Sequence, residues 1–227
     1  MSQALSLEPP LSLTERAAAQ LRADILSTRL APGEVISEAM AAERLELGKA
    51  PIRAALARLG EEGLVTSVPR RGWVVSLVTI RDIHEVFDLR LMLEPEAARR
   101  AAGRVDAEML QRLDAVCAAG YDPTDAASAM AFLQANKAFH VAIAELSGNA
   151  RLARQIARLL DESTRMLVLG LSRRDRTGEM AHEHHALVEA LALGRGEEAA
   201  RLMHGQVAES RAMVVAALTA PEAGIAI

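Results

Sequence analysis

The sequence predicts a mainly α protein in which three short helices and a small β-hairpin precede an all-α bundle of about six helices. Composition is one reason: 51% of the 227 residues are hydrophobic but only 2% are aromatic, and the helix-favouring residues Ala, Leu, Arg and Glu dominate. Periodicity is the other, because apolar residues recur at helical spacing along most of the chain, whereas β-branched runs gather between residues 64 and 78.

The first part of the chain alternates helix signals with turn signals. Residues 1–12 contain two prolines and no periodic pattern, which indicates a flexible arm. Three helices are then predicted in "TERAAAQLRADILSTRL", capped by Thr14, in "SEAMAAERL", capped by Ser37, and in "APIRAALARLGEEG". "LVTSV" and "WVVSLV", joined by the turn "PRRG", predict a hairpin. Residues 13–78 are therefore expected to form a winged helix-turn-helix.

The net charge of −4 does not exclude nucleic acid as a partner of this first part. Residues 1–79 carry nine Lys or Arg and nine Asp or Glu, so the acidic excess lies in the rest of the chain. A neutral domain can bind DNA when its cations cluster on one surface.

Five residues are the candidates for DNA contact. Lys49 and Arg53 share a face at the start of the third helix, the end that enters the major groove in this motif. Arg53 suits the guanine edge and Lys49 suits a phosphate. Arg70 and Arg71 with Gly72 form the tip of the wing, where glycine permits close approach to the sugar-phosphate backbone or the minor groove. The alternative is that these cations are only solvated surface charges. Their joint placement at the helix start and at the wing tip favours DNA contact.

The segment "APGEVISEAMAAERLELGKAPIRAALARLGEEGLVTSVPRRGWVV" resembles the N-terminal domain of the GntR superfamily of bacterial transcription regulators. The resemblance covers residues 14–78 and implies binding to a double-stranded DNA operator. The chain departs from the family at the start of the third helix. Gly48, Lys49 and Ala50 replace the usual Ser or Thr, Arg and Thr, so two hydroxyl groups are missing from the recognition turn.

Residues 79–220 are helical by pattern, and residues 221–227 are a tail. The pieces "LRLMLEPEAARRAA", "NKAFHVAIAELSGNARL" and "EHHALVEALALGRGEEAARLM" resemble the FCD domain of the FadR branch of the same superfamily. That resemblance implies an effector-binding and dimerisation domain. Many members bind a divalent metal at the bundle centre through an Asp or Asn and three His, with a small carboxylate effector beside it.

Three of those ligand places match residues of this chain directly. Asn136 and His140 are four apart in "NKAFH", so they lie on one side of a helix whose same side is otherwise apolar. Together with His184, they take the first three places that the resemblance implies.

The fourth place follows from the geometry of a helical hairpin. "LGRG" at 193–196 turns one helix back on the next, so residues equidistant from Arg195 face each other. His184 lies eleven residues before Arg195 and Gln206 eleven after it, whereas His204 lies about 200° round the helix from Gln206. Gln206, and not His204, is therefore predicted to occupy the last ligand position.

Two interpretations of Asn136, His140, His184 and Gln206 remain open. They could hold a divalent metal of the Zn, Ni or Mn type, weakly because two ligands are amides. The ion would then keep its full charge and favour an anionic effector, with Arg90 as the main candidate for a carboxylate clamp and Arg165 as a weaker one. Alternatively, the four form a hydrogen-bonded polar network that holds the bundle in register or binds an effector directly.

Two other function classes compete with a ligand-responsive regulator. A metal hydrolase would need a general base such as Glu145 or Glu183, but no H-E-x-x-H, nucleophile elbow or phosphate loop occurs. A winged-helix module could dock protein, but the cations favour phosphate. We therefore expect no enzyme but a homodimeric repressor on a palindromic operator.

The cysteine content and the hydropathy of the chain bear on its bonding and on its cellular location. Cys117 is the single cysteine, which excludes an internal disulfide and a cysteine-based zinc site and indicates a small buried residue. No apolar run approaches the roughly 20 residues that cross a bilayer, and the N-terminus lacks signal-peptide features. A cytoplasmic location without membrane contact is expected.

Overall fold

The computed structural model describes residues 11–122, 125–171 and 177–219. The chain divides into two compact units, Met1–Leu77 and Val78–Ile227, whereas the sequence placed the boundary after residue 78. Most of the predicted arm at 1–12 and all of the predicted tail at 221–227 lie outside the described residues.

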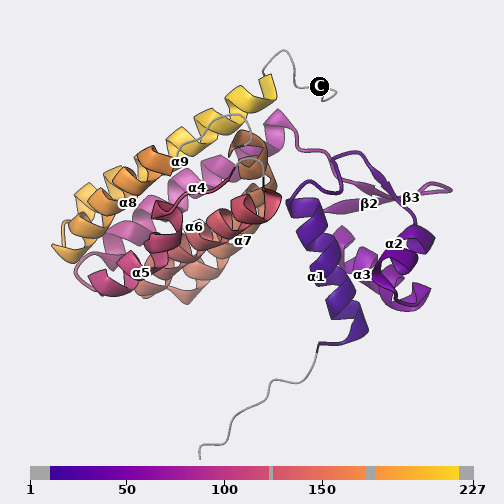
Figure 1. Cartoon of the computed structure of the whole chain (residues 1–227). Coiled ribbons are helices and arrows are strands. Elements are labelled where there is room, and N and C mark those ends of the chain that lie inside the picture. Colours follow the sequence, from indigo (N-terminus) through magenta and orange to yellow (C-terminus); the bar gives the residue numbers. More distant parts are fainter. Residues whose placement is uncertain (1–10, 123–124, 172–176, 220–227) are drawn as a thin grey trace, which may run out of the picture. The chain divides into compact units, whose positions relative to one another are not determined.

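The first unit has the predicted winged helix-turn-helix architecture (Figure 1). Its sheet is three-stranded and antiparallel, in the order β1-β3-β2, because a two-residue strand that the sequence did not predict pairs with β3. The elements are α1 (Leu13–Leu26), β1 (Val35–Ile36), α2 (Glu38–Leu45), α3 (Lys49–Glu61), β2 (Val65–Val68) and β3 (Gly72–Val75).

Caps set where these helices begin. Ser37 caps α2 by accepting from the Met40 amide, as predicted. The predicted cap Thr14 of α1 is wrong: Ser12 is the cap, because its hydroxyl and the Glu15 side chain satisfy each other's backbone amides in a capping box. α1 packs against α3, and Leu21, Leu56 and other apolar side chains form the core between the helices and the sheet.

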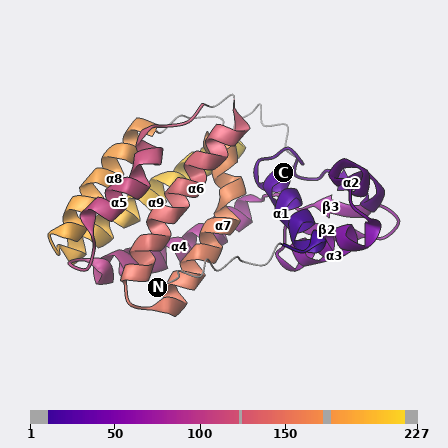
Figure 2. The same ribbon diagram turned by 60° about the horizontal axis from the view of Figure 1, so that its bottom comes forward.

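The second unit is a helical bundle, and its described part has the six helices that the pattern predicted. α4 packs along α9, and α6 packs against α7 (Figures 1 and 2). No described helix combines the length and the apolar composition needed to span a membrane. The helices are α4 (Ile80–Ala101), α5 (Ala107–Ala118), α6 (Ala126–Leu146), α7 (Ala150–Leu171), α8 (Thr177–Ala192) and α9 (Gly196–Thr219).

Large aromatic side chains are concentrated in the core of this bundle. All three phenylalanines of the chain, Phe87, Phe132 and Phe139, are at most 1% exposed there. Cys117 is buried in the same core, as expected for a small apolar residue. Polar residues buried in this core therefore lie in surroundings where an unpaired charge is costly.

Gly72 is required by the backbone of the wing, apart from any contact with DNA. It has φ +96°, and a Cβ there would lie 3.0 Å from the Ile36 carbonyl oxygen. We predict that Gly72→Ala lowers the free energy of unfolding by about 1–3 kcal/mol. Urea unfolding followed by the fluorescence of Trp73, the single tryptophan, measures this.

Gly63→Ala is the matched control, because Gly63 has φ +73° but no heavy atom within 4 Å of an added Cβ. It should cost less than Gly72→Ala. Equal losses would contradict a contribution from the close approach to Ile36.

Candidate functional site

A small cavity of about 10 Å³, roughly the size needed for one water, lies inside the bundle. Side chains from α4, α6, α7, α8 and α9 line it, so residues distant in sequence meet there. Its polar lining consists of Arg90, Asn136, His140, Glu183, His184, Gln206 and Ser210.

The four residues that the sequence singled out are brought together at this cavity. Asn136, His140, His184 and Gln206 all line it, and each is at most 5% exposed. His204 is exposed on another face of α9. The hairpin geometry therefore places the amide, and not the nearby imidazole, at the cavity.

A buried carboxylate fixes the orientation of His140. Its Nδ1 lies 2.6 Å from Oε2 of Glu94, whose other oxygen accepts a hydrogen bond from Arg90 Nε at 2.6 Å. Burial raises the pKa of Glu94, but the Arg90 charge and the contact with His140 outweigh it and hold the pKa at about 2. An ionised carboxylate only accepts, so Nδ1 of His140 carries the proton and Nε2 keeps a lone pair when the imidazole is neutral.

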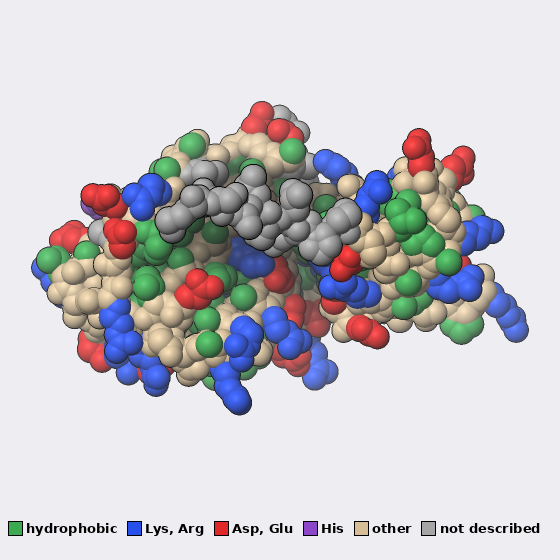
Figure 3. All heavy atoms as spheres, turned by 90° about the horizontal axis from the view of Figure 1, so that it is seen from below, with side chains coloured by type: hydrophobic (Ala, Val, Ile, Leu, Met, Phe, Trp, Pro, Cys, Tyr) green, Lys and Arg blue, Asp and Glu red, His purple; other side chains and the backbone are tan. Residues whose placement is uncertain are grey.

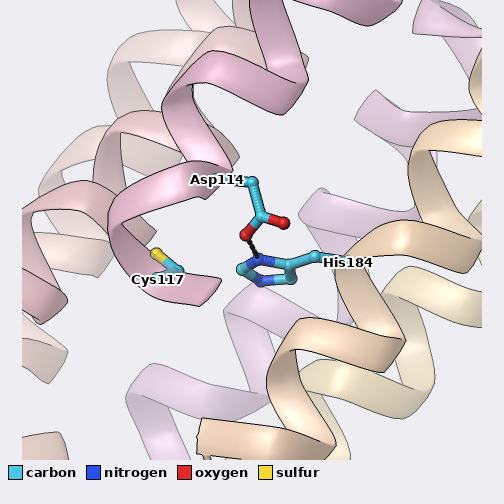
Figure 4. A group of neighbouring side chains, drawn as sticks. All are labelled: Asp114, Cys117 and His184. Atoms are coloured by element: carbon cyan, nitrogen blue, oxygen red, sulfur yellow. Dashed lines mark hydrogen bonds and ion pairs between the residues drawn. The ribbon is translucent and has the colours of Figure 1, made fainter. Parts of the chain in front are cut away.

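His184 is oriented in the same way by a carboxylate of another helix. Its Nδ1 lies 2.5 Å from Oδ1 of Asp114 on α5 (Figure 4), and its ring stacks on Phe139 at 4.2 Å between centroids. Burial lowers the pKa of His184 despite the opposing effect of Asp114. The ring centroids of His140 and His184 are 5.8 Å apart. Both imidazoles thus have Nδ1 bound to a carboxylate, and each keeps a lone pair on Nε2 when it is neutral.

Asp114, Cys117 and His184 also form a cluster of potential metal ligands, with the ligand atoms within 4.8 Å of one another (Figure 4). Burial, with the charge of Asp114, raises the pKa of the Cys117 thiol to about 12. The thiol stays protonated and Asp114 already binds His184, so this cluster suits a metal less well than the cavity does.

The two amide side chains leave their oxygens without partners. Nε2 of Gln206 donates to the Glu183 backbone carbonyl at 2.9 Å. This hydrogen bond fixes which end of the amide is the nitrogen and which is the oxygen, Oε1. Oε1 of Gln206 and Oδ1 of Asn136 are buried and accept no hydrogen bond from any described residue. Such an atom costs roughly 1–3 kcal/mol, so a ligand with donors or positive charge would relieve both.

The contacts of the four residues bear on the two interpretations that the sequence left open. Among the described residues, no hydrogen bond joins Asn136, His140, His184 and Gln206 to one another. Their bonds run to surrounding residues instead. The remaining set, two imidazole nitrogens and two amide oxygens, fits a divalent cation of the Zn, Ni or Mn type, although amides are weak ligands.

The two arginines proposed for an effector differ in position. Arg90 lines the cavity and is 2% exposed, with Nε bound to Glu94 and Nη1 donating to Ser163 Oγ at 3.2 Å. Arg165 is buried on α7 but is not among the residues lining this cavity. Burial lowers the pKa of Arg165, opposed by the charge of Asp82.

Sequence reasoning missed the two carboxylates that hold the imidazoles. Glu94 had a local signal, since it follows Arg90 by four residues, the spacing of a helical ion pair. Asp114 had none, because it is 70 residues from His184.

The candidate DNA-contacting residues lie on the winged unit. Lys49, Arg53, Arg70 and Arg71 are exposed, on the start of α3 and on the wing turn. Arg53 is bound to a glutamate of α2, whereas the two wing arginines have no ion-pair partner among the described residues. Lys and Arg side chains are interspersed with Asp and Glu on the face shown in Figure 3.

Two family models match the chain. The model described as "Bacterial regulatory proteins, gntR family" matches residues 13–75, and the FCD domain model matches residues 85–208.

Two curated relatives are regulators. The Nta operon transcriptional regulator of Aminobacter aminovorans is 29% identical over 176 residues, 76% of this chain and 80% of that protein. The HTH-type transcriptional repressor GlaR of Escherichia coli is 29% identical over 188 residues, 77% of this chain and 83% of that protein.

Solved structures show the same fold. A putative GntR transcriptional regulator from Rhodococcus sp. RHA1 has a TM-score of 0.73 at 23% identity, covering 90% of this chain and 98% of that one. McbR/YncC of E. coli has a TM-score of 0.75 at 22% identity, covering 91% and 98%.

The buried pair of Arg90 and Glu94 makes a prediction about stability. Glu94→Gln leaves the Arg90 charge buried without an anion, so we expect a loss of about 3–5 kcal/mol at neutral pH, measured by urea unfolding. Because the folded pKa of Glu94 is lowered from 4.5 to about 2, its stabilisation is present above pH 4.5 and is lost as the pH falls towards 2. The variant should lack this acid-sensitive component.

Glu85→Gln is the control, since it breaks the exposed Arg81–Glu85 pair on the same helix. It should change the stability far less. A similar loss in both variants would show that burial of the Arg90–Glu94 pair has no special weight.

Proposed function

Because the chain belongs to the GntR family of bacterial regulatory proteins and carries an FCD domain, we propose that it is a repressor whose helical unit responds to a small carboxylate. It is a DNA-binding transcription regulator, and its relatives are regulators and not enzymes. The repressor role, the effector and the metal are our proposals.

The observation that carries the sensing role is the set of unpaired acceptors at the cavity. Gln206 Oε1 and Asn136 Oδ1 are buried without partners, and His140 and His184 present Nε2 because carboxylates bind their Nδ1 atoms. A structural polar cluster would pair these groups with one another. A binding site keeps them free for a ligand.

Asn136, His140, His184 and Gln206 would hold a divalent ion through two nitrogens and two amide oxygens. When bound, the ion supplies a positive charge that no carboxylate among these four ligands neutralises, so it attracts an anion. Arg90 lines the same cavity and can donate to a carboxylate, although Glu94 balances part of its charge. Arg165 is not a lining residue, so we give it no direct contact.

On the DNA side, the start of α3 enters the major groove and the wing contacts the backbone. Arg53 binds a base edge, Lys49 a phosphate, and Arg70 and Arg71 the sugar-phosphate backbone or minor groove. A homodimer on a palindromic operator presents two such units. The protein acts in the cytoplasm, where bacterial operators are.

Coupling between the two units follows from differential binding. The effector shifts the placement of the winged units only as far as its affinity differs between the states that bind DNA and release it.

We predict that Arg53→Ala abolishes specific operator binding and leaves the thermal unfolding temperature nearly unchanged, because Arg53 is 68% exposed at its side chain. The probe is a duplex selected with the wild-type chain from a randomised library and tested by fluorescence anisotropy. Arg58→Ala, further along α3 and also exposed, is the control and should bind normally. Wild-type affinity in Arg53→Ala would refute its assignment.

We predict that Asn136→Asp raises the affinity for Zn²⁺, Ni²⁺ or Mn²⁺ at least about tenfold, because a carboxylate is a stronger ligand than an amide. His140→Ala should remove both metal binding and any effect of metal or carboxylate on DNA affinity, while retaining DNA binding. Calorimetric titration of chelator-stripped protein measures the affinities, and exposed His204→Ala is the control. Unchanged binding in both pocket variants would remove the cavity from the mechanism.

A further inference from the structure

Glu38, the first residue of α2, holds the guanidinium of Arg53 on α3. Arg53 Nε lies 2.9 Å from Oε1 and 3.0 Å from Oε2 of Glu38, and Arg53 Nη2 lies 2.7 Å from Oε2. The Glu38 side chain is 25% exposed and that of Arg53 is 68% exposed. The contact therefore lies at the surface of the winged unit, and it restrains the residue that we propose to contact a base.

The edge of the guanidinium that Glu38 occupies is informative. A guanidinium has five N–H donors in a planar fork. Glu38 engages the side edge, formed by Nε and one hydrogen of Nη2. Nη1 and the second hydrogen of Nη2 remain at the end of the fork. That end is the edge that can donate two parallel bonds to O6 and N7 of a guanine.

The charge of Glu38 selects between the two acceptors that DNA offers. A guanine edge carries no net charge. A phosphate oxygen is anionic, so a phosphate bound to Arg53 would be repelled by the Glu38 carboxylate that binds the same guanidinium. Hydrogen bonding from Arg53 lowers the pKa of Glu38 against the effect of desolvation, with smaller contributions from Trp73 of the wing strand and from Lys49. Glu38 is therefore an anion at neutral pH.

We propose that Glu38 is a specificity-determining residue, which positions Arg53 for the guanine edge and disfavours contact of Arg53 with phosphate. The inference rests on the proposed role of Arg53 in DNA binding. Arg70 and Arg71 have no carboxylate contact among the described residues, and Lys49 has a smaller electrostatic interaction with Glu38 but no ion pair, so all three remain suited to phosphate. Within one winged unit, Arg53 thus reads the base sequence, whereas the other three cations supply affinity through phosphate contacts.

The same unit contains a matched control pair. Arg22 of α1 donates to Glu62 from Nε at 2.9 Å and from Nη2 at 2.5 Å, and the Glu62 side chain is 34% exposed. Like Glu38→Gln, Glu62→Gln removes one negative charge from the winged unit and weakens an arginine–glutamate pair. The pair of Glu62, however, lies at the other end of α3. A general electrostatic effect would be equal in Glu38→Gln and Glu62→Gln.

The experiment compares wild type, Glu38→Gln, Glu62→Gln, Arg53→Ala and the double variant of Glu38→Gln with Arg53→Ala. Each full-length chain is titrated by fluorescence anisotropy into the duplex selected by the wild type and into a scrambled duplex of equal composition. Selection from the randomised library is repeated with Glu38→Gln. Thermal unfolding confirms that each variant is folded, and Glu38→Ala provides a second variant at the position.

We expect Glu38→Gln to lower the ratio of specific to scrambled affinity about tenfold, the size of one bidentate base contact, chiefly by strengthening binding to scrambled DNA. The selected sequences should lose preference at one guanine per half-site. Glu62→Gln should leave the ratio unchanged, and the double variant should match Arg53→Ala.

Equal ratios for Glu38→Gln and Glu62→Gln, with Arg53→Ala defective, would overturn the role of Glu38 alone. A double variant whose loss is the sum of both single losses would overturn it also. Normal specificity in Arg53→Ala would instead refute the DNA-contact assignment on which the inference rests.

Discussion

The buried Glu94 carboxylate is the group on which the arrangement of the cavity depends. A charge in the core of a helical bundle must be paired, and Glu94 is paired on both oxygens, by Arg90 and by His140. That pairing fixes Nδ1 of His140 as the donor, so that Nε2 is the acceptor when the imidazole is neutral. Asp114 does the same for His184 from another helix. Two carboxylates that do not themselves line the cavity thus determine what its imidazoles can bind.

The cavity itself is a local departure from the rules that stabilise a core. Two amide oxygens are buried without partners, which costs stability, in a bundle whose core is mainly apolar. Polar groups left unsatisfied in an otherwise consistent core are typical of functional positions. The winged unit has a parallel feature, because Glu38 binds an exposed arginine that would otherwise be free for any phosphate. Both features restrict what can bind.

Much of this could be predicted from residue spacing, because helical periodicity is a local property. The four-residue interval between Asn136 and His140 placed both on one side of a helix, and symmetry about a short hairpin placed Gln206 at the cavity. Contacts that depend on how separate helices pack had no such signal. Asp114 is 70 residues from its imidazole partner, and Glu38 reaches Arg53 across the turn between two helices. The short strand β1 was missed because two residues carry no recognisable alternation.

Native mass spectrometry of the full-length chain, purified without chelators, tests most directly whether the cavity is a binding site. The wild-type chain should retain a divalent ion, a small anion or both, or take them up from Zn²⁺, Ni²⁺ or Mn²⁺ supplied with simple carboxylates. The added mass should disappear in His140→Ala and persist in His204→Ala. A wild-type chain that stays at its sequence mass under all these conditions, or a His140→Ala chain that binds equally well, would contradict the account.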